Sequence, residues 1–167
     1  TINGGMTMRG WYDITSLVRN ANQDEDGIHQ SVGELRKLID RELVRGIPQN
    51  KIIIAGFSQG GAIAIYTALT LVSELGGLIA LSTYMPLEKS FTDLAKNSNK
   101  IQSSKLPIFF AHGSYDPVIP LSYGEKTKSF IEQFGYTVDW NEYPIEHSVS
   151  QREIKDIGQW ISRVLEL

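Results

Sequence analysis

An apolar run without alternation of apolar and polar side chains occupies residues 51–57, Lys-Ile-Ile-Ile-Ala-Gly-Phe. Such a β-branched run is typical of a strand that is covered on both faces, as in parallel sheets. Apolar runs recur at residues 77–82 and 106–112, and a last strand is expected at 137–143. Helical segments are expected at residues 24–45, 62–72, 123–134 and 154–165. This order predicts an α/β fold, with a mostly parallel sheet and helices on both faces.

Two further segments have weaker patterns. Residues 86–104 have no clear periodicity and are rich in Ser, Asn and Lys, so we interpret them as a surface excursion with at most one helical turn. In the last helix, the apolar residues are expected to form one buried stripe. These are Ile154, Ile157, Ile161, Val164 and Leu165.

Length and composition argue against several classes of protein. A chain of 167 residues predicts a single domain over 1–167. Sixteen Lys and Arg against 19 Asp and Glu give a net charge of −3, with no basic block of the kind that binds nucleic acid. No apolar run approaches the roughly 18 residues of a membrane span, so no stable membrane insertion is expected. The absence of cysteine excludes disulfides, a thiolate nucleophile and sulfur-ligated zinc.

The sequence Gly56-Phe57-Ser58-Gln59-Gly60 matches the G-x-S-x-G motif between a strand and a small-residue helix. In such a turn the serine has a strained backbone, and the glycines avoid side-chain clashes where strand and helix approach each other. The Gln59 N–H, at the start of the helix, is placed to stabilise an oxyanion. These features predict a nucleophilic Ser58. The alternative is a glycine-rich turn whose serine only caps the helix.

A nucleophilic serine requires a base and a group that orients the base. Of the three histidines, His147 follows the last strand, at the sheet edge where ligands bind in such folds, and is our candidate for the base. His29 is interpreted as a solvated helix residue. His112 is interpreted as a packing and hydrogen-bonding residue, and it is the alternative candidate for the base.

Asp116 is our candidate for the acid. It lies in the loop after the strand at 106–112, which Pro117 and Pro120 stiffen, although Asp-Pro is also a common turn pair. Glu146 is the alternative, ranked lower because adjacent loop residues such as Glu146 and His147 rarely face each other. The order Ser58, Asp116, His147 is that of the α/β-hydrolases.

With these motifs, the chain resembles the acyl-protein thioesterase and carboxylesterase family of small α/β-hydrolases. The segments 11–13, 46–48 and 81–87 are also similar to that family, so the resemblance covers essentially the whole chain. It implies an α/β-hydrolase fold, a Ser58–His147–Asp116 triad, and hydrolysis of small acyl esters or acylated proteins without a metal or organic cofactor. It also implies a cytoplasmic location and an acyl channel near four residues, each of which could equally serve only in packing. These are Trp11, Tyr84, Met85 and Val118.

One departure from the family concerns the N-terminal part of the fold. Family members begin with additional strands and a His-Gly-Leu-Gly type loop that supplies a second oxyanion donor, and neither is found here. The strand at 52–57 would then lie at or near a sheet edge, which invites pairing with another chain. We expect the domain to be N-terminally incomplete, or to obtain the missing strands in trans, for which a homodimer is one arrangement.

Two functions follow from this sequence. The first is a serine hydrolase that cleaves carboxylic esters or thioesters of short to medium acyl chains through an acyl-enzyme. The alternative is a catalytically impaired hydrolase remnant that binds an apolar ligand or a partner protein.

Overall fold

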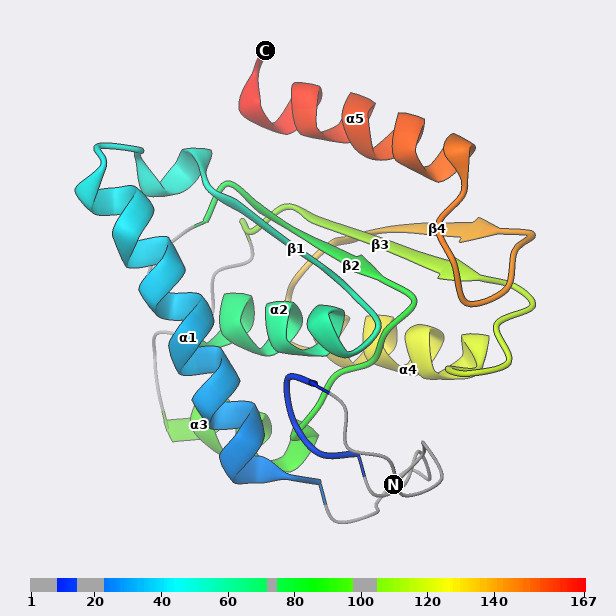
Figure 1. The fold of residues 1–167 in the computed structure, drawn as a ribbon, viewed down its shortest axis with the longest axis horizontal. Coiled ribbons are helices and arrows are strands. Elements are labelled where there is room, and N and C mark those ends of the chain that lie inside the picture. Colours follow the sequence, from blue (N-terminus) through cyan, green and yellow to red (C-terminus); the bar gives the residue numbers. More distant parts are fainter. Residues whose placement is uncertain (1–8, 15–22, 72–74, 98–104) are drawn as a thin grey trace.

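The computed structural model describes residues 9–14, 23–71, 75–97 and 105–167. At the centre of the described part is a parallel sheet of four strands in chain order (Figure 1). These are β1 (Ile53–Phe57), β2 (Gly77–Leu81), β3 (Ile108–Gly113) and β4 (Val138–Tyr143). Phe57 pairs with Leu81, Leu81 with Ala111, and Gly113 with Tyr143, so all four strands end at the same edge of the sheet. The predicted parallel sheet is confirmed.

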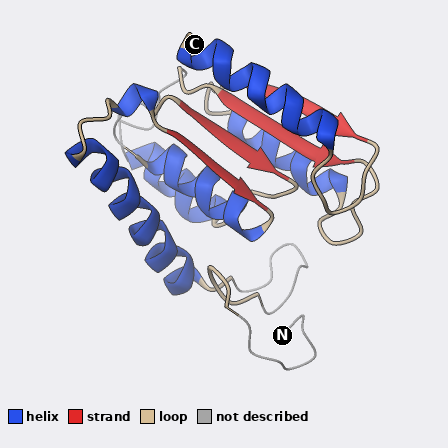
Figure 2. Ribbon diagram, turned by 45° about the horizontal axis from the view of Figure 1, so that its top comes forward, coloured by secondary structure: helices blue, strands red, loops and turns tan. Residues whose placement is uncertain are grey.

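Helices cover both faces of the sheet, as expected (Figures 1 and 2). On one face lie α2 (Gln59–Thr70) and α4 (Leu121–Glu132), with α1 (Glu25–Val44) packed beside α2. On the other face lies α5 (Gln151–Leu165). The two sides have separate cores: the larger lies between the sheet and α2, and the smaller gathers under α5 around Phe109 and Trp160.

Burial of the strands depends on their place in the sheet. All six residues of β3 are buried, as expected for a strand covered on both faces. In β1, by contrast, Ile54 is buried but Ala55 and Phe57 are exposed, so the expectation of full coverage is wrong for this strand. The reason is that β1 lies at an edge of the sheet in the described part of the chain.

The predicted surface excursion is wrong for the described residues 86–97, because Glu88–Asn97 form the helix α3. Leu87, Phe91 and Ala95 recur every four residues and pack against the larger core. Phe91 is the anchor of this helix: its ring contacts the rings of Phe130 and Phe134 at centroid distances of 5.9 and 5.0 Å. A stripe of three residues in a polar segment is too short to stand out as a period.

The buried stripe of α5 differs by one position from the prediction. Ile154 is exposed, whereas Glu153 and Trp160 are buried and Ile157, Ile161 and Val164 are partly buried. Successive residues of a helix are about 100° apart, so burial of Glu153 turns Ile154 toward solvent. Glu153 is drawn inward by a reciprocal capping box with Ser150, and burial raises the pKa of its carboxyl.

His112, in β3, is buried and holds the loop that follows the strand. Its Nε2 lies 2.9 Å from the Ile119 carbonyl oxygen, and because a carbonyl only accepts, Nε2 carries the proton. Its Nδ1 has no hydrogen-bond partner among the described residues. Burial lowers the pKa of His112 below its ordinary value of 6.5, while the bond to Ile119 and the charge of Asp116 oppose this shift. The neutral ring therefore fixes the loop that carries Asp116.

We expect Phe91→Ala to reduce the free energy of unfolding by about 3–5 kcal/mol, because it removes a fully buried ring. Leu94→Ala is the matched control on the same helix: Leu94 is 46 % exposed, so its loss should cost much less. Urea unfolding followed by circular dichroism measures both. Equal losses would contradict the anchoring role of Phe91.

The buried neutral His112 also predicts a pH dependence of stability. Because the unfolded chain binds a proton at His112 more readily than the folded chain, the free energy of unfolding should fall as the pH drops below about 6.5. His112→Gln retains a donor for the Ile119 carbonyl but does not titrate. Its unfolding free energy, measured in urea from about pH 7 to pH 5, should therefore fall less than that of the wild type. Parallel curves for the two proteins would refute this assignment.

Candidate active site

Ser58 lies in the turn between β1 and α2, at the carboxyl end of the sheet. Its φ of 54° and ψ of −123° are strained for a residue other than glycine, at a cost of about 1–3 kcal/mol. The turn is tight: a Cβ on Gly56 would lie 2.2 Å from the Gly60 carbonyl oxygen. The hydroxyl makes no capping bond to the helix, so the helix-capping alternative is not observed.

The structure brings Ser58, His147 and Asp116 into one hydrogen-bonded row. The Ser58 Oγ lies 2.9 Å from His147 Nε2, and His147 Nδ1 lies 2.7 Å from Asp116 Oδ2. A carboxylate only accepts hydrogen bonds, so Nδ1 carries the ring proton and Nε2 can accept the proton of the serine hydroxyl. This arrangement can remove a proton from Ser58 and stabilise the resulting imidazolium.

Backbone groups hold Asp116 in this orientation. Its Oδ1 accepts hydrogen bonds from the N–H groups of Val118 and Ile119, both at 2.8 Å, which leaves Oδ2 facing His147. The Asp116 side chain is fully buried, whereas Glu146, the alternative acid, is exposed.

The other two histidines lie in different surroundings. His29 is exposed on α1, 3.6 Å from Glu25, in agreement with its interpretation as a solvated residue. His112 is buried and bonded to Ile119, which agrees with a packing and hydrogen-bonding role.

The loops that carry Asp116 and His147 are joined to each other. The N–H groups of Ser114 and Tyr115 donate to the carbonyls of Tyr143 and Ile145 at 2.8 and 3.0 Å, which extends the contact of β3 with β4 beyond the strands. Gly113 permits the close approach, since a Cβ there would lie 2.4 Å from the Glu146 carbonyl oxygen. Backbone contacts therefore hold the loop that carries His147 against the loop that carries Asp116.

Three side chains to which the sequence analysis gave no role make contacts at the site. The Phe57 ring packs on the His147 ring at a centroid distance of 4.6 Å. The Gln59 carboxamide accepts from the Trp11 N–H at 2.8 Å and donates to the Tyr12 carbonyl at 2.6 Å. The Thr83 hydroxyl donates to the Ser58 carbonyl at 2.6 Å. Phe57 and Gln59 lie within the motif, but nothing in the sequence pointed to Thr83.

Gln59 is the first residue of α2, so its N–H has no partner within the helix and lies at the positive end of the helix dipole. The described residues therefore place one backbone donor directly after Ser58.

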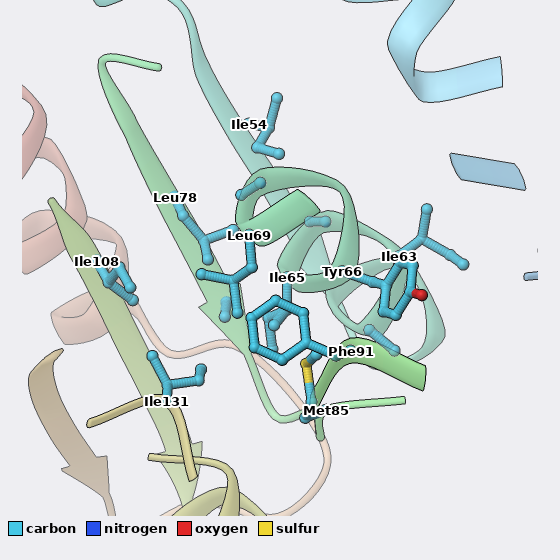
Figure 3. Close-up of a cluster of buried hydrophobic side chains, with 14 of the residues drawn as sticks. Ile54, Ile63, Ile65, Tyr66, Leu69, Leu78, Met85, Phe91, Ile108 and Ile131 are labelled. Carbon is cyan, nitrogen blue, oxygen red and sulfur yellow. The ribbon is translucent and has the colours of Figure 1, made fainter. Parts of the chain in front are cut away.

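The four residues predicted near an acyl channel lie in different surroundings. Trp11 and Val118 are 45 % and 43 % exposed, and Trp11 Nε1 lies over the first turn of α2, near Gly60. The Tyr84 hydroxyl lies 2.8 Å from the Tyr12 hydroxyl, and burial raises the pKa of both phenols. Met85 is buried in the larger core beside Phe91, where packing accounts for it (Figure 3).

The described part of the chain contains no group of three or more His, Cys, Asp or Glu side chains arranged to hold a metal ion. None of the described helices is both long enough and apolar enough to cross a bilayer.

Comparisons with known proteins agree with this fold. Residues 1–165 match the Phospholipase/Carboxylesterase family model. The chain is 40 % identical to acyl-protein thioesterase 1 of Yarrowia lipolytica, over 96 % of this chain and 71 % of that protein. It is 38 % identical to acyl-protein thioesterase 1 of Neurospora crassa, over 99 % of this chain and 69 % of that protein.

A solved structure extends the agreement to three dimensions. The crystal structure of Arabidopsis thaliana SOBER1 superposes with a TM-score of 0.87 at 30 % identity, covering 98 % of this chain and 77 % of that chain. The match spans the sheet and its helices and confirms the predicted α/β-hydrolase fold. The chain belongs to the phospholipase/carboxylesterase family of α/β-hydrolases.

Proposed function

We propose that this protein hydrolyses carboxylic esters or thioesters of short to medium acyl chains through a catalytic triad of Ser58, His147 and Asp116. Its family makes it a hydrolase enzyme. The triad, the acyl-chain length and the identity of the substrate are the parts that we propose.

The observation that carries this proposal is the unbroken row from Ser58 through His147 to Asp116, with distances of 2.9 and 2.7 Å. Side chains 89 and 31 residues apart have no structural need to meet in this way. A nucleophile within hydrogen-bond distance of a base, which is itself oriented by a third group, is the arrangement that activates a serine hydroxyl.

The proposed reaction has two halves. Ser58 Oγ attacks the carbonyl carbon while His147 Nε2 takes the hydroxyl proton, and Asp116 Oδ2 stabilises the imidazolium. The N–H of Gln59 donates to the oxyanion of the tetrahedral intermediate. The imidazolium then returns its proton to the departing alcohol or thiol, which leaves an acyl-enzyme. Water, deprotonated by His147, attacks the acyl-enzyme, and Ser58 regains its proton as the carboxylic acid leaves.

The apolar side chains exposed near the triad are suited to bind the acyl chain of the substrate. Trp11 and Val118 present exposed apolar side chains on segments hydrogen-bonded to Gln59 and Asp116, and we propose that they contact the acyl chain. We propose the same for Tyr84, whose hydroxyl lies 2.8 Å from that of Tyr12, the neighbour of Trp11 in the chain. Two relatives are named acyl-protein thioesterase 1, which supports an acylated protein as the substrate. Small acyl esters would use the same contacts.

Ser58→Ala is expected to abolish both the hydrolysis of nitrophenyl acyl esters and labelling by a fluorophosphonate probe, since each requires the activated hydroxyl. The control is Ser129→Ala on α4, which removes an exposed serine hydroxyl that donates to the Glu125 backbone carbonyl. It should leave both the hydrolysis and the labelling unchanged. Rates over esters from acetate to laurate measure the preferred chain length, expected among the short to medium members.

Full activity of Ser58→Ala would overturn the assignment of the nucleophile. A wild-type protein that is folded but takes up no probe would instead support the alternative of an impaired hydrolase that binds an apolar ligand or partner.

Asp116→Asn tests the orienting role of the acid. An asparagine can still accept from the N–H groups of Val118 and Ile119, but its NH₂ group would face His147 and favour the wrong tautomer of the ring. In a precedent serine hydrolase this change lowers kcat about 10⁴-fold, and we expect a loss of similar order in nitrophenyl ester hydrolysis. Glu146→Gln, the exposed alternative, should change kcat little. The reverse result would make Glu146 the acid.

A further inference from the structure

The backbone of Ser58 is held from the neighbouring strand rather than by its own turn alone. Its φ of 54° is unfavourable for serine, so surrounding contacts must maintain the conformation that directs Oγ toward His147. The Ser58 N–H donates to the Leu81 carbonyl, the last residue of β2, at 2.9 Å. This contact continues the pairing of β1 with β2 and holds the peptide group on the N-terminal side of Ser58.

The peptide group on the C-terminal side of Ser58 is held by the side chain of Thr83. The Thr83 Oγ1 donates to the Ser58 carbonyl oxygen at 2.6 Å, and the same oxygen accepts the first helical bond of α2, from the Ala62 N–H at 3.1 Å. A carbonyl oxygen has two lone pairs, so both bonds can form at once. Both peptide groups next to the Ser58 Cα therefore bond to residues at or just beyond the end of β2.

Thr83 is placed so that its hydroxyl has little freedom to point elsewhere. The residue is fully buried, two positions after β2. Its methyl side faces Gly61, where an added Cβ would lie 2.8 Å from both Thr83 Cβ and Cγ2. The first turn of α2 therefore packs against the methyl group of Thr83, while the Thr83 hydroxyl bonds to the Ser58 carbonyl oxygen.

We propose that Thr83 is a positioning residue for the nucleophile, whose hydroxyl holds the strained Ser58 peptide so that Oγ stays within reach of His147 Nε2. This inference rests on the proposed function of Ser58. It assigns a role in turnover rather than in substrate binding, because Thr83 acts on Ser58 through the backbone.

The chain offers a matched control for this idea. Thr67, on α2, is also fully buried, but its Oγ1 has no hydrogen-bond partner among the described residues. Thr83→Val and Thr67→Val are therefore the same chemical change at two buried sites, and only the first removes a bond to Ser58. Thr83→Ser keeps the hydroxyl and removes the methyl group.

The first measurement is steady-state hydrolysis of a nitrophenyl ester, with the rate of fluorophosphonate labelling at Ser58. A displaced nucleophile costs up to about 10²-fold in rate, so we expect Thr83→Val to lower kcat and the labelling rate by about 10- to 100-fold with little change in KM. Thr67→Val should match the wild type, and Thr83→Ser should recover most of the loss. Thr83→Val rates equal to those of Thr67→Val, or a change confined to KM, would overturn the proposal.

The second measurement does not depend on activity. Amide hydrogen exchange should be faster for Ser58 and Ala62 in Thr83→Val than in Thr67→Val, because the Thr83 bond no longer restrains the turn. Equal exchange in the two variants would count against Thr83 as a positioning residue. If Thr83→Val does not fold, Thr83→Ala and Thr67→Ala make the same comparison. A wild type that takes up no probe defeats the proposed function, while the exchange data still decide whether Thr83 holds Ser58.

Discussion

The parallel register of the sheet is the constraint on which the active site depends. Because β1, β3 and β4 end at one edge, the loops that follow them start close together and can bring Ser58, Asp116 and His147 into contact. Ser58 and His147 nevertheless leave strands at opposite sides of the four-stranded sheet. The loop after β4 closes this gap by turning back across the end of β3, where Gly113 leaves room for its backbone.

The groups proposed for catalysis are held largely by backbone and buried polar contacts. Ser58 is hydrogen-bonded to the end of β2, and Asp116 accepts hydrogen bonds from two N–H groups of its own loop. The buried His112 donates a hydrogen bond to a carbonyl of the same loop. Trp11 and Val118, proposed to contact the acyl chain, are instead exposed. Rigid support of the reacting atoms beside an open apolar surface suits an enzyme whose substrates share an acyl carbonyl and differ in the attached groups.

Sequence patterns predicted the elements with strong local signals. The apolar runs marked β1, β2 and β3, and the G-x-S-x-G motif marked the turn at Ser58, because both depend on neighbouring residues alone. The errors have a common origin in tertiary packing. Phe91 makes α3 a packed helix although the segment is polar, and burial of Glu153 turns Ile154 outward.

The sequence by itself determined the order of the four strands and of the helices other than α3, the strained serine turn and the candidates for base and acid, since residue type and spacing carry that information. Only the tertiary structure decided that Asp116 rather than Glu146 meets His147, that Thr83 bonds to the Ser58 carbonyl, and that Phe57 packs on His147. The first two contacts join residues from separate loops, and the contact of Phe57 joins a strand to a distant loop. Their geometry follows from how the sheet pairs and how the loops cross its edge, which no local pattern encodes.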